Sequence, residues 1–493
     1  MLARPSTTET AFQMRDHVCP NGVRLRPMNP CVIVGGGFAG MVAARRLQQI
    51  GVRATVLEKG DVDGGLGNAV ISGGLLHIAW EPPDSPADVK RERLLAETSG
   101  EIDDELAGAL ASQSGNIIPW LQAEGVEMRA KTEEPATRWT LWPFRVGTGR
   151  RLLPDLGPSK AMQRLYERFR EWRGDLRMGA AAHSLHRLSG GWQVGFQTEA
   201  GEASLEAGTV LFADGGFQAN QEMLSRYVGP NAGLCLLRAS TTGTGDGLRM
   251  LLENGAEAVG LGRVYGHLVS INALESDELW PFPHLDELCM VGVVVTRHGD
   301  RVPVDTSAVG LVTRMARSED PRGFAVVFDE EIWNGEPGRG KLGLPAPNPE
   351  LMRRGAHLVS SDTISGLAQR LACKPDRLAR AIAAHNTVRG ACPVSRPPFH
   401  AARVIPGITF TMGGAKIGPD AAVRAPGGRA IPGLFAAGST AGGIQGGPNG
   451  GYVGGLATAA TFGYIAAESI AAYVQSAAKS ARSRASPGQP DGG

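Results

Sequence analysis

The chain has 493 residues, and its 50 Lys and Arg residues against 49 Asp and Glu residues give a net charge of +1. This length indicates two or more domains, and the balanced charge argues against a broad basic face that would bind nucleic acid or an anionic membrane. The six cysteines are far apart and form no CxxC pair, which argues against a disulfide framework and against zinc, iron–sulfur and c-type haem sites, so we expect no metal.

Residues 1–28 are polar and show no periodic pattern, and we expect them to form a loosely ordered N-terminal extension. They contain no apolar run of the kind found in a secretory signal. No later stretch reaches the ~18 apolar residues of a membrane span. We therefore expect a cytoplasmic protein without a membrane span.

The first patterned segment, 31–47, predicts a buried strand, a glycine-rich turn and a helix. Gly35 would allow the tight turn, Gly37 would let a pyrophosphate approach the main chain, and Gly40 would let the helix pack against the strand. The N–H groups at the start of such a helix bind phosphate. This order of elements predicts a dinucleotide-binding site.

A second strand, predicted over 54–57, ends at Glu58, 18 residues after Gly40. A carboxylate at this spacing would accept hydrogen bonds from the ribose hydroxyls. The next segment, 64–74, has glycines at both ends of a short polar stretch, which suggests main chain wrapped closely around a flat or anionic ligand.

Gly67-Asn68 and Ser72-Gly73-Gly74, together with this dinucleotide-binding start, resemble the FAD-binding domain of the superfamily of fumarate reductase, succinate dehydrogenase and 3-ketosteroid Δ1-dehydrogenase, which also contains tricarballylate-type dehydrogenases. Further segments resemble the same family in the same order, and the resemblance covers roughly 29–475: 210–217, 244–247, 411–414 and 431–438. It implies an α/β fold with a Rossmann-type FAD-binding domain, built from a parallel sheet and a small β-meander, and an inserted α+β cap domain.

The patterns between these segments agree with that architecture. Amphipathic helices are predicted over 116–124 and 160–172, and a β-hairpin over 186–196. The expected cap contains strands over 291–296 and 324–328 and helices over 362–373 and 376–385. The expected division of the chain is an extension (1–28), the first part of the FAD-binding domain (29–247), the cap (248–395), the second part of the FAD-binding domain (396–475) and a disordered tail (476–493).

The cofactor that the resemblance implies is FAD. Relatives that bind FAD covalently use a histidine six residues before the Gly73-Gly74 pair, and Gly67 stands at that place here, so we expect non-covalent binding. The ring would be lined by Gly73-Gly74 and 412–414, and Gly454-Gly455 would direct the start of a helix over 456–472 towards it. The candidate cofactor-binding residues are Gly35, Gly37, Phe38, Ala39, Gly40, Glu58, Lys59, Gly67, Asn68, Ala69, Ser72, Gly73, Gly74, Asp214, Gly215, Gly414, Gly438, Gly454, Gly455 and Leu456.

Two residues are candidates for catalysis. His267 stands where fumarate reductases place a substrate histidine, but Phe410, Val309 and Asn449 stand at other histidine and arginine places of that machinery. The resemblance therefore implies redox chemistry at carbon–carbon bonds without the dicarboxylate site. Tyr452, shortly before a glycine pair and a helix, resembles a tyrosine of the ketosteroid branch, at a shorter spacing from the helix.

These residues favour an FAD-dependent dehydrogenase that removes hydrogen α,β to a carbonyl or carboxylate, with Tyr452 or His267 polarising the carbonyl. An ene-reductase of fumarate reductase type and a flavin-dependent monooxygenase remain alternatives. A flavoprotein that binds RNA is disfavoured, because basic residues occur only in short pairs. The expected partners are a small-molecule substrate and a separate electron-transfer protein or quinone, because the sequence has no second GxGxxG turn for NAD(P)H. No nucleic-acid partner is expected.

Overall fold

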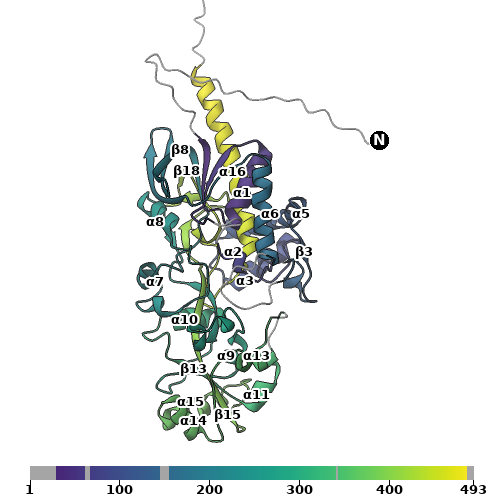
Figure 1. The fold of residues 1–493 in the computed structure, drawn as a ribbon, viewed down its shortest axis with the longest axis vertical. Helices are drawn as coiled ribbons and strands as arrows, with labels where there is room; N and C mark the ends of the chain where they lie inside the picture. Colours follow the sequence, from purple (N-terminus) through teal and green to yellow (C-terminus); the bar gives the residue numbers. More distant parts are fainter. Residues whose placement is uncertain (1–28, 62–66, 145–154, 340–341, 343, 486–493) are drawn as a thin grey trace, which may run out of the picture.

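The computed structural model describes residues 29–61, 67–144, 155–339, 342 and 344–485. The expected extension 1–28 and the beginning of the 64–74 segment lie outside the described residues. Those residues form two lobes stacked along the long axis of the molecule (Figure 1).

A parallel sheet organises the first lobe. The strand order is β17-β18-β8-β1-β2-β5, with parallel pairing throughout except between β17 and β18. Strand β1 lies between β8 and β2, and its residues 31–34 are at most 4% exposed. The bounds are β1 Asn29–Val34, β2 Ala54–Leu57, β5 Asp175–Arg177, β8 Gly201–Phe212, β17 Ala422–Arg424 and β18 Ala430–Ala436.

A small antiparallel meander extends this sheet. Strand β6 (Ala181–Leu188) pairs with β7 (Gly191–Thr198), and β7 pairs with β8. The predicted hairpin and the predicted combination of parallel sheet and meander are both confirmed.

Helices α1 (Phe38–Ile50) and α16 (Gly455–Ala485) pack closely against each other beside the sheet (Figure 1). Glycine permits the approach, since a Cβ at Gly463 would lie 2.4 Å from the carbonyl oxygen of Ala39. The predicted amphipathic helices are found as α5 (Ile117–Ala123) and α6 (Gly157–Glu171). The other helices associated with this lobe are α2 Asn68–Ile71, α3 Ala87–Glu97, α4 Asp104–Gln113, α7 Gln221–Tyr227 and α8 Asp246–Glu253, and a two-stranded sheet is formed by β3 Met128–Arg129 and β4 Thr140–Leu141.

Helix α16 continues beyond the expected ordered region. It runs to Ala485, beyond residue 476, where the predicted tail begins. Alanine has the highest intrinsic helix propensity, and the Ala-rich sequence after Val474 extends the helix without needing a buried face. Residues 486–493 lie outside the described part of the chain.

A six-stranded sheet organises the second lobe. Its main path is β11-β15-β13-β12, and β14 and β9 also pair with β15. The strands are β9 Leu236–Leu237, β11 Val264–Ser270, β12 Val293–Thr296, β13 Phe324–Asp329, β14 Leu358–Ser361 and β15 Phe399–Thr411. The helices of this lobe are α9 Asp286–Val291, α10 Ala308–Ala316, α11 Glu330–Asn334, α12 Glu336–Arg339, α13 Pro347–Arg353, α14 Ile364–Leu371 and α15 Pro375–Asn386.

The second sheet crosses both expected borders of the cap, 248 and 395. Strand β15 starts after residue 395 yet pairs with β11 and β13, and strand β9 lies before residue 248 yet pairs with β15. A strand pattern alone does not reveal its partner, so the sequence could not assign these elements to a sheet. The division of the chain into domains stays a prediction.

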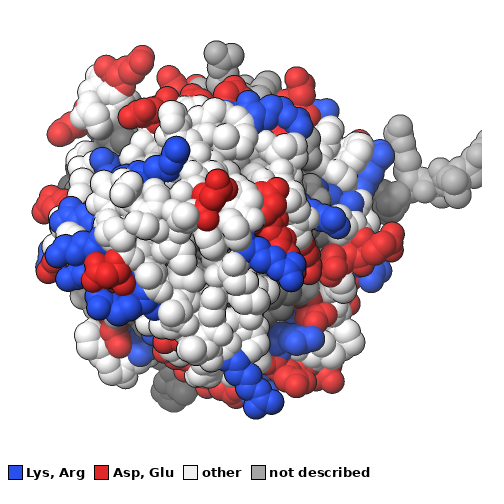
Figure 2. Space-filling view, turned by 90° about the horizontal axis from the view of Figure 1, so that it is seen from below, with Lys and Arg blue, Asp and Glu red and all other residues white. Residues whose placement is uncertain are grey.

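A three-stranded sheet lies where the lobes meet, formed by β10 (Ala258–Val259), β16 (Gly414–Lys416) and β19 (Ala441–Gly442). No helix in the part of the chain that the structure describes is both long and apolar enough to cross a membrane. On the face of the molecule drawn in Figure 2, basic and acidic side chains are interspersed around an uncharged centre.

Candidate functional site

One cavity extends from the turn after β1 to the residues of the second lobe that face it. We call one part the glycine end, which is lined by Gly35, Gly37, Gly67, Gly73 and Gly215. We call the other part the side-chain end, which is lined by Arg238, Tyr265, His267, His284 and Tyr452. The two ends differ in the groups that they present to a ligand.

The turn between β1 and α1 leaves open space at the glycine end. Gly35 has φ +99°, and a Cβ there would lie 2.6 Å from the carbonyl oxygen of Ala213, so a larger residue does not fit. A Cβ at Gly37 would meet its nearest atom only at 3.8 Å. Gly37 directly precedes α1, whose first N–H groups are therefore accessible from the cavity. This arrangement fits a pyrophosphate.

Glu58 and Lys59 follow β2 at the same end. Glu58 accepts hydrogen bonds from the main-chain N–H groups of Gly36 (2.7 Å) and Gly60 (2.8 Å), so it holds the turn that precedes α1. The ammonium of Lys59 lies 3.0 Å from the carboxylate of Asp246. Both side chains line the cavity, where a carboxylate oxygen retains further lone pairs for a ribose hydroxyl.

Asn68 joins the glycine end to the second lobe. Its amide donates to the carbonyl of Thr409 on β15 (2.7 Å) and accepts from the N–H of Ser240 (2.8 Å). The short helix α2 is thereby held against the strand that carries the side-chain end.

The predicted cofactor-binding residues lie at the cavity with three exceptions. Gly40, Gly414 and Gly454 do not line it and instead allow close packing. A Cβ at Gly40 would lie 2.0 Å from the carbonyl oxygen of Gly35, which agrees with its predicted role between helix and strand. The predicted residues that do line the cavity are Gly35, Gly37, Phe38, Ala39, Glu58, Lys59, Gly67, Asn68, Ala69, Ser72, Gly73, Gly74, Asp214, Gly215, Gly438, Gly455 and Leu456.

Asp214 is the half-buried acid of the glycine end. Its carboxylate accepts from the N–H of Gly247 (2.7 Å) and from the hydroxyl of Thr440 (3.1 Å). Burial raises its pKa to about 6, although the hydrogen bond from Gly247 acts to lower it.

Tyr452 and Tyr265 form a stacked pair at the side-chain end. Their ring centroids are 3.8 Å apart with an interplanar angle of 16°. The Tyr452 hydroxyl accepts the N–H of Gly455, the first residue of α16, at 3.2 Å. Phe410, which stands where the family resemblance places a histidine, packs against Tyr265 and lines the cavity.

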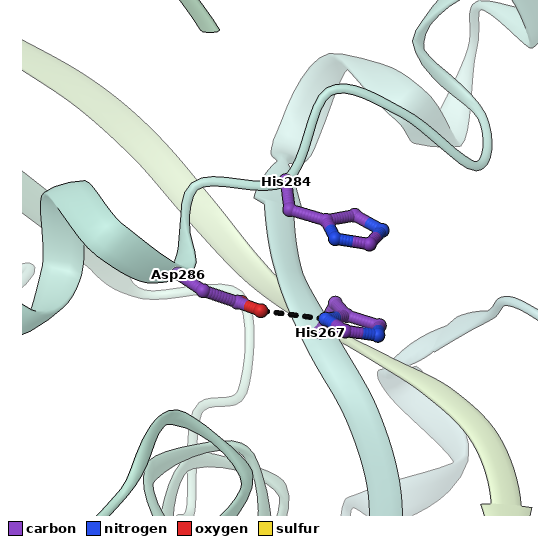
Figure 3. Close-up of side chains that lie close together, drawn as sticks. All are labelled: His267, His284 and Asp286. Carbon is purple, nitrogen blue, oxygen red and sulfur yellow. Dashed lines mark hydrogen bonds and ion pairs between the residues drawn. The ribbon is translucent and has the colours of Figure 1, made fainter. Parts of the chain in front are cut away.

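His267 lies beside this pair and is bonded at both ring nitrogens. Its Nε2 is 2.9 Å from the Tyr265 hydroxyl, and its Nδ1 is 2.5 Å from the carboxylate of Asp286 (Figure 3). Tyr265 and His267 are two residues apart on β11, and alternate residues of a strand share a face. Asp286 begins α9 on a separate segment.

His284 stacks on His267 and connects it to an arginine. The two rings are 3.7 Å apart and nearly parallel, at 13° (Figure 3), and His284 Nε2 lies 2.7 Å from the Arg238 guanidinium. Arg238 is 9% exposed and also donates to the carbonyl of Pro281 (3.1 Å) and the hydroxyl of Thr409 (2.8 Å).

His267, His284 and Asp286 are close enough together to be considered as metal ligands. The stacked rings direct their nitrogen lone pairs side by side rather than towards one point, and Arg238 brings a cation to His284. Both features suit a hydrogen-bonded network better than a metal ion, which needs converging ligands.

Burial controls the protonation of this network. It lowers the pKa of His267, while Asp286 acts to raise it and Arg238 to lower it. Burial lowers the pKa of His284 well below its ordinary value and raises the pKa of Tyr265 well above its ordinary value. Both histidines and Tyr265 are therefore neutral at neutral pH.

His77 and Trp80 complete the wall next to Tyr452. Their rings are stacked with centroids 4.7 Å apart, and the His77 ring meets Tyr452 edge-on at 5.5 Å. Burial lowers the pKa of His77 to about 4, and its Nδ1 accepts the N–H of Trp80 at 3.2 Å.

The structure brings both predicted catalytic residues, Tyr452 and His267, to the cavity. Sequence reasoning missed Arg238, His284 and Asp286 because they lie on separate segments that only the fold brings together. Tyr265, a weaker candidate for substrate contact from the sequence, lines the cavity. His400, another histidine of the second lobe, is bonded to Ser360 and Glu330 and does not line the cavity.

Comparison with known proteins finds a matching family and relatives over most of the chain. The FAD binding domain family matches residues 31–454. The probable fumarate reductase Ifc3 of Shewanella frigidimarina is 24% identical over 485 residues, covering 90% of this chain and 74% of the relative. The vinyl phenol reductase of Lactiplantibacillus plantarum is 25% identical over 469 residues, covering 85% and 91%. The structure of a 3-ketosteroid Δ1-dehydrogenase from Sterolibacterium denitrificans shares the fold, with a TM-score of 0.71 and 18% identity over 91% of this chain and 100% of that one.

Proposed function

The chain belongs to the FAD-binding family and is an FAD-dependent oxidoreductase that acts on carbon–carbon bonds, and from this premise we propose a substrate class for it. The substrate carries a carbon–carbon bond next to a carbonyl or carboxylate, bears a ring, and has at most one negative charge. FAD, when bound, supplies the hydride acceptor or donor.

The observation that carries this proposal is the composition of the side-chain end. Among the described residues that line the cavity, the cationic side chains are Arg238 and Lys59, and Lys59 is paired with Asp246 at the glycine end. A buried dianion would need more than one fixed cation. One arginine suits a single carboxylate or a carbonyl oxygen.

The remaining walls suit a ring. Aromatic side chains surround Arg238 and the tyrosine pair, and they exclude water from the reacting carbons. The aromatic residues that line this end are Trp80, Tyr265, Trp280, Phe282, Phe410 and Tyr452. Arg238 and His284 would orient the carbonyl or carboxylate, and the tyrosine hydroxyls would hydrogen-bond to the substrate as charge develops there.

The test is a panel of substrates offered to the purified, FAD-loaded enzyme. We expect arylacrylates and cyclic enones to reoxidise the chemically reduced enzyme in the absence of oxygen, and their saturated counterparts to reduce a dye. Fumarate, a dianion of similar reactivity, is the matched control and should react more slowly. Fumarate reacting fastest would contradict the proposal.

In this proposal electrons enter or leave through a separate electron-transfer protein or quinone. The sequence has no second glycine-rich nucleotide turn and no cysteine cluster that could relay them. The cytoplasm is the compartment that we propose, and fractionation of cells that express the full-length chain would test it.

A further inference from the structure

The side-chain end contains a continuous row of hydrogen bonds from Asp286 through His267 to Tyr265. We propose that Tyr265 carries the proton of the reaction, that His267 exchanges this proton with the Tyr265 hydroxyl, and that Asp286 is a positioning residue that fixes the tautomer of His267. This inference rests on the proposed function, because it assigns the proton carrier of the same site. It adds a proton carrier to a site in which Tyr452 or His267 was predicted to polarise the carbonyl.

The hydrogen bonds of Asp286 determine which ring nitrogen of His267 carries the hydrogen. One carboxylate oxygen accepts the main-chain N–H of Leu268 at 2.7 Å, and the other lies 2.5 Å from His267 Nδ1. A carboxylate only accepts hydrogen bonds, so Nδ1 of His267 carries the hydrogen. The neutral ring then has its lone pair on Nε2.

That lone pair faces the hydroxyl of Tyr265 at 2.9 Å. Tyr265 therefore donates its O–H to His267 and presents a phenol oxygen whose proton has a base to move to. This is the arrangement by which a base activates a weakly acidic hydroxyl. The Tyr265 and His267 side chains both line the cavity where the substrate is proposed to bind.

Tyr452 lacks such a direct link to a base. Its hydroxyl accepts the N–H of Gly455, and its ring packs face to face on Tyr265. Any proton that leaves Tyr452 towards His267 passes through Tyr265 first. Tyr452 is therefore suited to hold the substrate oxygen and the ring of Tyr265 in place.

The proton and electron balance is simple in the dehydrogenation direction. The C–H bond next to the carbonyl breaks and its proton goes to the Tyr265 oxygen, while the proton of Tyr265 goes to His267 Nε2. FAD, when bound, would accept the hydride of the neighbouring carbon, and the electron pair of the broken C–H bond would become the C=C bond. Asp286 then faces an imidazolium, whose positive charge it stabilises. In the reduction direction each transfer is reversed.

The first measurement reads the tautomer without turnover, in FAD-loaded enzyme labelled with ¹⁵N-histidine. We expect the NMR spectrum to show His267 with hydrogen on Nδ1, with the signal assigned by its loss in His267→Gln. Asp286→Asn places an amide that can donate to Nδ1, so we expect the hydrogen to move to Nε2. Wild-type His267 with hydrogen on Nε2 would overturn the proposal, because Tyr265 would then face a donor.

The second measurement follows the single-turnover rate of flavin reduction by a substrate. Tyr265→Phe and Asp286→Asn should each lower this rate on the order of 10²–10⁴-fold, the range for loss of general acid–base catalysis, with substrate affinity little changed. Tyr452→Phe should lower it less and weaken substrate binding. A larger rate loss in Tyr452→Phe than in Tyr265→Phe would overturn the assignment.

Glu330→Gln is the matched control. It removes the carboxylate from another histidine–carboxylate pair, His400–Glu330 (2.7 Å), which does not line the cavity, so it should leave the rate and the His267 signal unchanged. If no substrate in the panel reacts, the proposed function fails. The tautomer and its response to Asp286→Asn then still decide whether the hydrogen-bond row exists as described.

Discussion

The two ends of the cavity are built from different parts of the polypeptide. The glycine end presents main chain, open space and the start of α1, whereas the side-chain end presents a dense network of rings and ionisable groups. The glycine end needs positions that carry no side chain, whereas the side-chain end needs several side chains that lie close together. A main-chain site therefore depends on local spacing, while the side-chain network depends on the packing of distant segments.

The ends also respond to pH in opposite ways. Burial favours the neutral form of both groups, since it lowers the pKa of His77 to about 4 and raises the pKa of Asp214 to about 6. Acid charges the first group, and base charges the second. The following experiments test one end of the cavity at a time.

The largest expected effect comes from an anion placed at the glycine end. Gly37→Asp should weaken FAD binding by on the order of 10²–10³-fold, because like charges about 4 Å apart repel by ~4 kcal/mol at an effective dielectric constant of 20. Gly37 has φ −68° and precedes α1, where Asp is a preferred helix cap, so the fold should persist. Flavin absorbance after desalting and the melting temperature of the apoprotein measure the two effects.

Gly37→Asn is the matched control, since it caps the helix without a charge. It should retain more FAD than Gly37→Asp. Equal FAD content in the two variants would show that charge at this place does not matter, and that the pyrophosphate lies elsewhere.

At the side-chain end, His77 should make the free energy of unfolding decrease as the pH falls. Its pKa in the folded state is lower than the ordinary 6.5. Its stabilising contribution to the free energy of unfolding is therefore fully present above pH 6.5 and is lost as the pH falls towards about 4. One pKa unit corresponds to about 1.4 kcal/mol, so up to ~3 kcal/mol of unfolding free energy is at stake. Urea titrations between pH 7 and 4 should show this loss in the wild type and a smaller loss in His77→Asn.

Asp214 should give the opposite slope at the glycine end. Its folded-state pKa is raised from 3.8. Its stabilising contribution to the free energy of unfolding is therefore fully present below pH 3.8 and is lost as the pH rises through about 6. Asp214→Asn, which retains an acceptor for Gly247, should gain stability relative to the wild type as the pH rises from 4 to 7. A constant difference across that range would refute the assignment.

Arg238 should matter for charged substrates more than for neutral ones. Arg238→Lys retains the charge but loses the planar guanidinium that bonds to Pro281, Thr409 and His284. We expect kcat/KM to fall about tenfold for a carboxylate substrate, a loss of about 1.4 kcal/mol of transition-state stabilisation. A cyclic ketone should be affected less.

Arg403→Lys serves as the reference for this variant, because Arg403 lies on β15 away from the cavity and donates to the carbonyl of Leu371. It should leave kcat/KM unchanged for both substrates. Equal losses for the acid and the ketone in Arg238→Lys would mean that the arginine does not bind the substrate's charged group.

The smallest expected effect is in the acid limb of the wild-type rate. Protonated His267 cannot accept a proton, so the dehydrogenation rate falls in acid. An ordinary histidine is half protonated at pH 6.5, whereas the pKa of His267 is lowered by burial, so the rate at pH 6.5 should fall by less than about twofold from its plateau. Single-turnover rates from pH 8 to 5 measure this limb, and a midpoint above pH 6.5 would contradict it.

The sequence by itself determined the architecture and most of the glycine end. The spacing of Gly35, Gly37 and Gly40 before Glu58 predicted a dinucleotide site. The resemblance of the later glycine-rich segments to a known family implied the sheet, the meander and FAD, and the family match confirms the FAD-binding fold. These features are local, because a turn or a helix start is set by residues within a few positions of each other. Tyr452 and His267 were found in the same way, through their positions beside such segments.

Only the tertiary structure decided the partners of those two residues. Arg238 follows β9, His284 lies in a loop, and Asp286 begins α9, and no sequence spacing relates them to Tyr265 or Tyr452. They meet because β15 pairs with β11 and β9 and because α2 is bonded to β15 through Asn68. Strand pairing and burial act between residues far apart in the chain, so the chemistry of the side-chain end is fixed only when the lobes come together.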